Sequence, residues 1–247
     1  MKKFFKISCL VPLFLFISNT QAKAATFSID LGSQEGPEGL SSSLKILIFL
    51  TFLTFLPSIV MVMTSFTRLT IIFSMLRTAL GTQSTPSNQI LVGLSMFLTF
   101  FIMSPVVSEM NTEAIQPYMQ GLITEEEFID EVKEPIQAFM LNHTRSKDLE
   151  LFVNLSEIEE VSSPAELPFT AVVPAFIISE LKTAFEISFL LFLPFVIIDF
   201  AVSSILMSMG MFMLSPVMIS LPFKILLFVM VDGWHLIIET MVKSFMR

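Results

Sequence analysis

This sequence is poor in the residue types on which most enzymes depend. Its 247 residues include one cysteine, two histidines and eight glycines, and only 15% are charged. The cysteine, Cys9, lies in a segment that we expect to be removed, which would leave no disulfide or thiolate chemistry. The histidines, His143 and His235, lie in different regions. No zinc-protease, nucleophile-elbow or phosphate-loop motif occurs, so we predict neither an enzyme nor a cofactor or metal site.

The charge balance argues against nucleic acid as a partner. The net charge is −8, which argues against binding nucleic acid. Adjacent carboxylates occur at residues 125–127 and 159–160. Acid–base or metal chemistry would require these groups to converge in space. A solvated acidic face or a helix N-terminus is the simpler interpretation.

Hydrophobic residues, by contrast, are abundant. They make up 53% of the chain, which includes 27 phenylalanines, and this composition is typical of membrane proteins. Four apolar segments are each about long enough to cross a hydrocarbon core of ~30 Å at ~1.5 Å per residue. They are Ile46–Thr67, Ile90–Ser108, Ile187–Met209 and Met213–Val231. We predict an all-α fold of membrane-associated helical hairpins.

Prolines 57, 105, 194, 216 and 222 lie in or beside these apolar segments. Proline breaks or kinks a helix, and Pro57 should kink the first segment. Broken helices within a membrane are tolerated where protein or a water-filled cavity satisfies the freed backbone groups. The prolines therefore favour kinked helices in a packed assembly or conduit over a simple anchor.

The N-terminus has the features of a secretory signal peptide. Three lysines precede an apolar stretch, Ile7–Ile17, which is too short to span a membrane. An Ala-Lys-Ala pattern at 22–24 predicts cleavage before Ala25, although an uncleaved anchor is the alternative. The polar, glycine-containing residues 25–44 would then form a periplasmic tether.

Residues 45–108 are predicted to form the first helical hairpin. The connection at 68–89 carries Arg68 and Arg77 and no acidic residue, so the positive-inside rule places it in the cytoplasm. Its first part is apolar between the two arginines, so the first apolar segment could continue as one long helix. The second segment should end near Pro105.

Residues 109–186 form an acidic region that we expect to be a small helical periplasmic domain. It holds sixteen acidic and four basic residues. Thr124 and Glu127 have the spacing of a capping box that opens a helix, and Pro135 interrupts the pattern. Two further helices are predicted at Leu149–Leu155 and Ala171–Glu186.

Residues 187–247 are predicted to form a second hairpin and a C-terminal tail. Between Asp199 and Lys224 the chain runs 24 residues without a charge. In an antiparallel hairpin these two side chains would lie at matching depth, and pairing would reduce the cost of burying them. Alternatively, Lys224 could reach the head-group region and Asp199 could face water independently.

The turn of this hairpin is rich in methionine. Residues Met207, Met209, Met211 and Met213 alternate around Gly210. Methionine is flexible and polarizable, so such a cluster suits a surface that adapts to varied contacts. Alternate spacing is unusual for a helix face, although simple packing in a helix core is the alternative.

The sequence resembles the FliP family of type III protein export gates, which is related to the SctR subunits of virulence injectisomes. The resemblance covers nearly all of residues 45–240. It rests on three groups of motifs: Arg68–Arg77 with Gly81–Gln89, Lys182–Glu186 with Phe192–Asp199, and Leu221–Ile225 with Val231–Trp234.

This resemblance implies a pore-forming subunit of the flagellar export gate, in the bacterial inner membrane within the flagellar basal body. Its partners would be further copies in a ring, expected to be a pentamer, the FliQ and FliR subunits, other membrane proteins of the export apparatus and unfolded flagellar substrates. A methionine-rich loop would seal the closed pore, and it corresponds to Gly210, Met211, Phe212 and Met213, with Met209 beside it. Phe212 stands where relatives often have methionine. The alternatives are an injectisome subunit, a small-solute or ion transporter, and a membrane enzyme.

Overall fold

The computed structural model describes residues 37–156 and 163–246, and this part of the chain is helical without a β-strand. The predicted all-α fold is therefore confirmed. The predicted signal peptide at 1–24 lies outside the described residues. The helices are α3 (Pro37–Val62), α4 (Phe66–Leu80), α5 (Asn88–Met110), the π-helix η1 (Asn111–Ile115), α6 (Gln116–Met119), α7 (Glu125–His143), α8 (Ser146–Leu155), the 3-10 helix η2 (Pro164–Glu166), α9 (Phe169–Ser208), α10 (Pro216–Met230) and α11 (Gly233–Phe245).

Several of these helices are long and apolar enough to cross a membrane. Three candidate spans occur within the described residues: Leu44–Val62, Asn88–Met119 and Phe169–Ser208. A fourth is possible if α10 and α11, which are bent by 62° relative to each other, form one broken span. The helices thus give the chain the character of an all-α membrane protein.

The chain divides into two compact units between Thr54 and Phe55. The described part of the first unit is helical from Pro37 onward, within α3. The predicted tether at 25–44 is therefore helical over its last residues, and its first part lies outside the described residues. Proline fits the first turn of a helix, where its missing N–H costs nothing.

The break between α3 and α4 corrects two expectations. The first apolar segment does not continue as one long helix, because α3 ends at Val62 and α4 begins at Phe66. The Thr64 hydroxyl donates to Met61 O at 3.1 Å and accepts from Phe66 N at 3.4 Å. Such local side-chain bonds compete with the helical pattern. Consequently, most of the connection predicted at 68–89 is a helix and not a loop.

Two prolines interrupt their helices less than predicted. Helix α5 continues through Pro105 to Met110, and α7 continues through Pro135 to His143. Proline removes one helical hydrogen bond, but packing against neighbouring helices can retain the helix. Both prolines are in helices that contact each other in the second unit.

Helix α7 begins with the predicted capping box. The Thr124 hydroxyl accepts from Glu127 N at 3.3 Å, and Thr124 N donates to the Glu127 carboxylate at 2.7 Å. Both hydrogen bonds from Thr124 lower the pKa of the Glu127 carboxyl. The bond from the Thr124 backbone has the larger effect, and the bond from its hydroxyl has the smaller one. The chain reverses direction before this cap. The reversal brings Tyr118 of α6 onto Phe128 of α7, with ring centroids 4.7 Å apart.

The predicted boundary between residues 186 and 187 falls inside a continuous helix. Helix α9 has 40 residues and joins the expected helix 171–186 to the third apolar segment. The charges that suggested a boundary lie on one helical face, where Lys182 Nζ is 3.5 Å from Glu186 Oε1. An i,i+4 pair of this kind is compatible with an exposed helical face.

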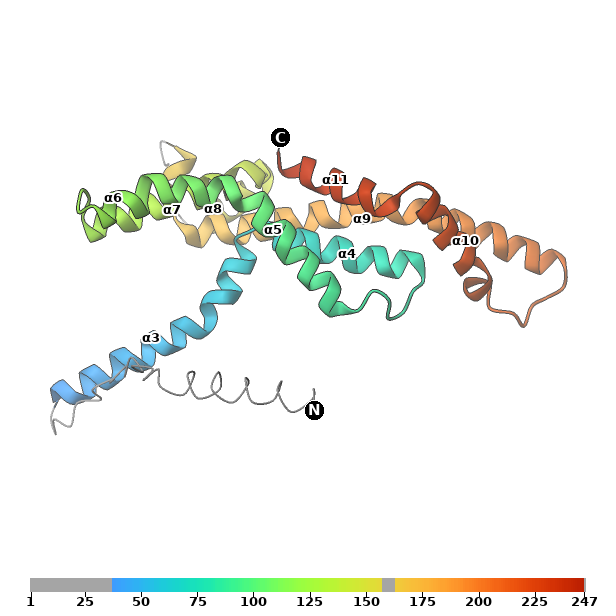
Figure 1. Ribbon diagram of the computed structural model, residues 1–247, viewed down its shortest axis with the longest axis horizontal. Coiled ribbons are helices and arrows are strands. Elements are labelled where there is room, and N and C mark those ends of the chain that lie inside the picture. Colours follow the sequence, from blue (N-terminus) through green and yellow to red (C-terminus); the bar gives the residue numbers. More distant parts are fainter. Residues whose placement is uncertain (1–36, 157–162, 247) are drawn as a thin grey trace, which may run out of the picture. The chain divides into compact units, whose positions relative to one another are not determined.

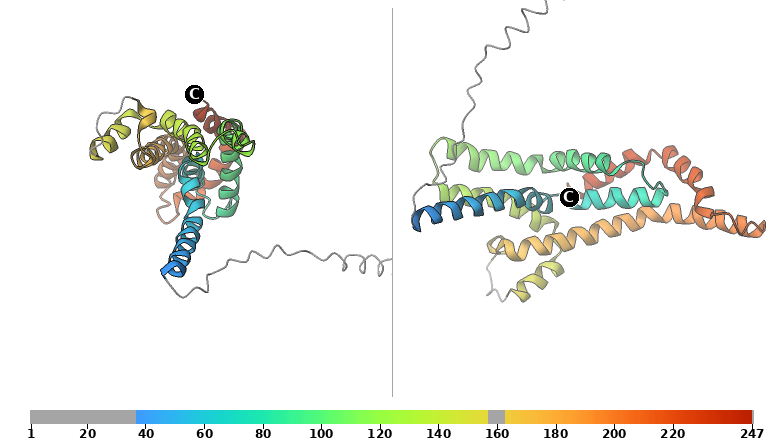
Figure 2. Two further views of the ribbon diagram at one scale, coloured as in Figure 1. Left: turned by 90° about the vertical axis from the view of Figure 1, so that its left-hand side faces the viewer. Right: turned by 90° about the horizontal axis from the view of Figure 1, so that it is seen from below.

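The core of the second unit forms where α4 packs along the middle of α9 (Figures 1 and 2). Helix α4 contributes fully buried apolar side chains at Leu69, Ile72 and Phe73, which pack in one cluster with Val172 and Phe176 of α9. Helices α5, α7 and α11 add residues to the same cluster. The core thus joins the apolar helices to the acidic helical region in one packed unit.

A sharp bend separates α10 from α11. Asp232 adopts a left-handed conformation, with φ of 50°, and Gly233 begins α11. A Cβ atom at position 233 would lie 2.3 Å from the ring of Phe228. Phe228 also contacts Trp234 edge to face, with centroids 5.4 Å apart. The bend returns α11 toward the core, where Met241 is fully buried.

Candidate functional site

The methionine turn connects α9 to α10. Helix α9 ends because Gly210 adopts a left-handed conformation, with φ of 76°, which glycine adopts at no steric cost. The Gly210 and Met211 N–H groups donate to Met207 O and Leu206 O at 3.1 and 3.0 Å, the pattern of a Schellman cap. Pro216 then starts α10 in the first-turn position that suits it.

The apolar side chains of this turn are exposed within the chain. Met213 is fully exposed, Phe212 is 77% exposed, and Met209 and Met211 are also exposed. The alternative prediction was that the methionines fill a helix core. Within one chain they do not, because their side chains are exposed. Four large apolar side chains are thus exposed at one tip, and exposed apolar patches are a common feature of interaction surfaces.

Asp199 and Lys224 lie together on the two helices that lead to this tip. Lys224 Nζ is 2.6 Å from Asp199 Oδ2, and the lysine side chain is nearly buried whereas the aspartate is partly exposed. Ser220 donates to Asp199 Oδ1 at 2.5 Å. The carboxylate therefore receives a bond on each oxygen, and α9 and α10 are joined below the turn.

Lys224 also reaches a third helix. Its Nζ donates to Ala79 O of α4 at 3.2 Å. The last carbonyl groups of a helix lack intrahelical donors and carry partial negative charge. Lys224 thus caps the end of α4 while it neutralises Asp199, and sequence spacing alone could not have predicted this second contact.

The two arginines predicted to share a cytoplasmic loop differ in their surroundings. Arg77, in the last turn of α4, donates to Asn88 Oδ1 at 2.6 Å and to Pro86 O at 3.3 Å. It therefore holds the connection between α4 and α5 in place. Arg68 is not in a loop at all, because it lies in the first turn of α4 and is only 3% exposed.

Arg68 forms a buried ion pair with Glu180 of α9, which is fully buried. Arg68 Nε donates to Glu180 Oε2 at 2.8 Å, and a second short bond joins Arg68 Nη2 to Glu180 Oε1. Arg68 Nη1 donates to Ser244 Oγ at 2.9 Å, and its guanidinium carbon lies 3.8 Å from the centre of the Phe245 ring. Three helices, α4, α9 and α11, thus meet at one arginine.

The sequence did not predict this pair, because Arg68 was expected in a loop and Glu180 in the acidic region. A signal was nevertheless present. Glu180 is the only charge between residues 167 and 181, so it stands alone in an apolar stretch as Asp199 does. Arg68 therefore gives no support to a cytoplasmic location for this segment, because an arginine paired inside the protein does not report which side of the membrane it faces.

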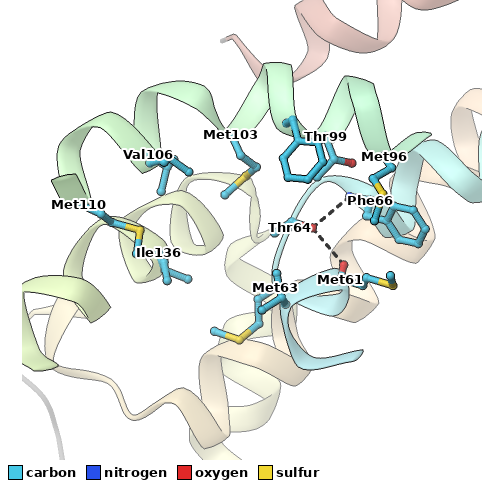
Figure 3. Close-up of a pocket in the computed structure, with 13 residues that line it drawn as sticks. Met61, Met63, Thr64, Phe66, Met96, Thr99, Met103, Val106, Met110 and Ile136 are labelled. Atoms are coloured by element: carbon cyan, nitrogen blue, oxygen red, sulfur yellow. Dashed lines mark hydrogen bonds between the residues drawn. The ribbon is translucent and has the colours of Figure 1, made fainter. Parts of the chain in front are cut away.

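A separate apolar pocket of about 290 Å³ lies where the end of α3 and the start of α4 meet α5, with Ile136 of α7 also in its lining (Figure 3). Nothing in the sequence pattern indicated it. Elsewhere, no group of three His, Cys, Asp or Glu side chains within residues 37–156 and 163–246 is arranged to hold a metal ion.

The fold and these contacts define an all-α membrane protein whose apolar helices are joined by paired charges and carry an exposed methionine turn. The chain belongs to the FliP family, whose sequence profile matches residues 49–241.

Curated relatives extend over most of the chain. The flagellar biosynthetic protein FliP of Bacillus subtilis is 54% identical over 217 residues, which cover 88% of this chain and 98% of the relative. The FliP proteins of Aquifex aeolicus and Pectobacterium carotovorum are each 50% identical. They cover 85% of this chain and 89% and 81% of their own lengths, respectively. The resemblance inferred from the motifs is therefore confirmed.

Proposed function

We propose that this chain is a non-enzymatic subunit of the flagellar type III export gate in the bacterial inner membrane. In this proposal several copies form a ring, expected to be a pentamer, together with FliQ and FliR subunits. Unfolded flagellar proteins cross through its centre, and a large part of the chain lies on the periplasmic side. The relatives described above carry flagellar names, which favours the flagellar branch over an injectisome.

The observation that carries the proposal is the exposed methionine turn, which lies at the end of a hairpin whose two helices are joined by the Asp199–Lys224 ion pair. Met209, Met211 and Met213 have no fixed hydrogen-bonding demand and adapt their shape, so they could close a pore and still contact many passing sequences. Phe212 adds a rigid ring at the same tip. The Asp199–Lys224 pair below the turn would hold the hairpin in register while the tip deforms.

Exposed apolar surface supports the idea of an assembly. The candidate span Leu44–Val62 has none of its residues buried within the chain, and only 11% of the apolar window of α9 is buried. Lipid could cover some of this surface, and neighbouring subunits could cover the rest. A single chain has no enclosed conduit of its own in this proposal, so the pore requires other copies.

Replacement of the turn methionines tests the sealing function. Serine at positions 209, 211 and 213 should allow ions to leak through the reconstituted assembly, because small polar side chains cannot exclude water. Assembly should be retained, since these side chains are exposed. Met230, which is 75% exposed at the end of α10, provides the control: Met230→Ser should leave conductance unchanged.

Two results would argue against this function. Unchanged conductance in the turn variant would mean that the methionines do not seal a pore. A purified chain that binds a small solute as a monomer or dimer, and that does not assemble with other subunits, would instead favour a transporter. Conductance measured in planar bilayers and mass measured on native complexes distinguish these outcomes.

A further inference from the structure

Three residues on one side of α10 face the end of α4. Val217, Leu221 and Lys224 are spaced by four and three positions, so they lie on the same face of the helix. A Cβ atom at position 81 would lie 3.5 Å from Leu221 Cδ1 and 4.0 Å from Val217 Cγ1. Lys224 Nζ is 3.2 Å from Ala79 O. The first turns of α10 therefore rest on the last turn of α4 and on the glycine that follows it.

These contacts lie close to the methionine turn. Helix α10 begins at Pro216, and only three residues separate Met213 from Val217. The large apolar side chains of the turn are exposed, so packing at the tip itself does not fix their position. Their position is set instead by α9 and α10, and by the surface on which the start of α10 rests.

The conformation of the α4–α5 connection places Gly81 against α10. Gly81 is left-handed, with φ of 76°, and its N–H donates to Thr78 O at 3.0 Å, which ends α4. The Thr82 hydroxyl donates to Arg77 O at 3.3 Å. These bonds turn the chain away from the helix axis directly after the last turn of α4.

Arg77 fastens the far end of the same connection. Its Nη1 donates to Asn88 Oδ1 at 2.6 Å and to Pro86 O at 3.3 Å, so one nitrogen serves two acceptors at the start of α5. Arg77 is the only charged residue between residues 69 and 108. No second charge in this stretch can therefore replace its bonds.

We infer that Arg77 is a positioning residue for the methionine turn. It closes the α4–α5 connection so that Gly81 supports the first turns of α10, and α10 then holds the methionines in place. Lys224 fixes α10 two turns further from the tip than Val217 does, so loss of Arg77 loosens the start of α10 without releasing the rest. The consequence for sealing rests on the proposed function, whereas the support of α10 does not.

Hydrogen exchange and ion conductance together test this role. The full-length chain in its native assembly is compared with Arg77→Met, which removes the donors and keeps an unbranched side chain. Amides at residues 218–221 should exchange about tenfold faster, as expected for the loss of one hydrogen bond from a charged group, and the assembly should leak ions. Arg77→Lys should restore most of the protection and reduce the leak, because a lysine ammonium can donate to both acceptors.

Two further variants make the comparison decisive. Asn88→Ala removes one acceptor at an exposed position, so it should fold normally and raise the same exchange rates to a smaller extent. Lys182→Met removes an exposed cation of α9 and should change neither measurement.

Unchanged exchange at residues 218–221 in both Arg77→Met and Asn88→Ala would overturn the inference. Equally faster exchange in α7 and α11 would also overturn it, because it would show a general loss of stability. If the serine variant of the methionine turn leaks and Arg77→Met does not, the sealing function stands and the positioning role is wrong. If exchange rises only at the start of α10 and neither variant leaks, the positioning role stands and the sealing function is wrong.

Discussion

Arg68 and Glu180 form a fully buried, two-bonded ion pair although 112 positions separate them in the chain. Removal of one partner leaves the other charge buried without its counter-charge, which costs about 3–5 kcal/mol. We therefore predict that Glu180→Gln strongly lowers the free energy of unfolding of the detergent-solubilised protein. Denaturant titration followed by circular dichroism measures this loss.

The exposed pair Lys182–Glu186 on the same helix provides a matched control. Its side chains are more than half exposed, and such pairs contribute about 0–1 kcal/mol. Glu186→Gln should therefore change stability little. The double variant Arg68→Met, Glu180→Leu should recover much of the loss, because it removes both charges. Equal effects of Glu180→Gln and Glu186→Gln would contradict the assigned role of the buried pair.

The second buried contact, between Asp199 and Lys224, predicts coupled effects in flagellar export. Asp199→Ala leaves a nearly buried ammonium without its carboxylate, and Lys224→Ala leaves Asp199 Oδ2 and Ala79 O without their donor. Each single variant should reduce motility and export. The double variant should be less impaired than the sum of the two, with a coupling of about 0.5–3 kcal/mol in stability.

Ser220 provides a graded comparison for this pair. Ser220→Ala removes one bond to Asp199 and leaves the ion pair intact, so its effect should be smaller than that of either charge removal. A double-variant cycle read from both unfolding and secretion assays measures the coupling. Strict additivity in both assays would show that the two charges act independently.

Asp148 predicts a pH dependence in the acidic region. Burial opposes its ionisation, but the hydrogen bonds from Ser179 and Arg145, with the charges of Arg145 and Lys182, together lower the pKa of Asp148. A carboxyl whose pKa is lower when folded stabilises the folded state above its unfolded pKa of ~3.9. That stabilisation is lost as the pH falls from this value through the lowered folded pKa.

Hydrogen exchange of the α8 amides, corrected for intrinsic rates, should therefore show protection that falls below about pH 4. In Asp148→Asn the protection should be weaker at neutral pH and should change less in the acid range. Asp130, an exposed partner of Lys133 at 2.9 Å, is the control, and Asp130→Asn should leave α8 unaffected. A protection profile of Asp148→Asn identical to that of the unchanged chain would exclude the role of this carboxylate.

The sequence predicted those features that depend on local pattern. Hydrophobic runs located the apolar helices, and the spacing of Thr124 and Glu127 located a helix start, because both signals act within a few residues. Prolines at 105 and 135 were weighted too heavily. A proline within a helix has a free-energy cost that depends on its own turn of helix. Whether the helix continues through it depends on packing against residues that are distant in the sequence.

The charged contacts show the same division. The symmetry of one hairpin was enough to suggest that Asp199 and Lys224 meet. No comparable relation connects Arg68 to Glu180, because their contact depends on the packing of α4 along α9. The contact of Lys224 with Ala79 O was equally inaccessible, since backbone acceptors at a helix end carry no sequence signature.

The bend between α10 and α11 gives the last prediction. A Cβ atom on residue 233 would lie 2.3 Å from the Phe228 ring, a distance at which one of the two must move. Gly233→Ala should therefore cost about 1–3 kcal/mol and weaken the protection of α11 in hydrogen exchange.

Gly93 of α5 has no atom within 4 Å of the corresponding position, so Gly93→Ala should instead be neutral or stabilising, by up to about 1 kcal/mol. Phe228→Leu should partly rescue Gly233→Ala, because the smaller side chain gives the new methyl group room. If Gly233→Ala proves as well tolerated as Gly93→Ala, then the close approach of Gly233 to Phe228 does not determine the bend.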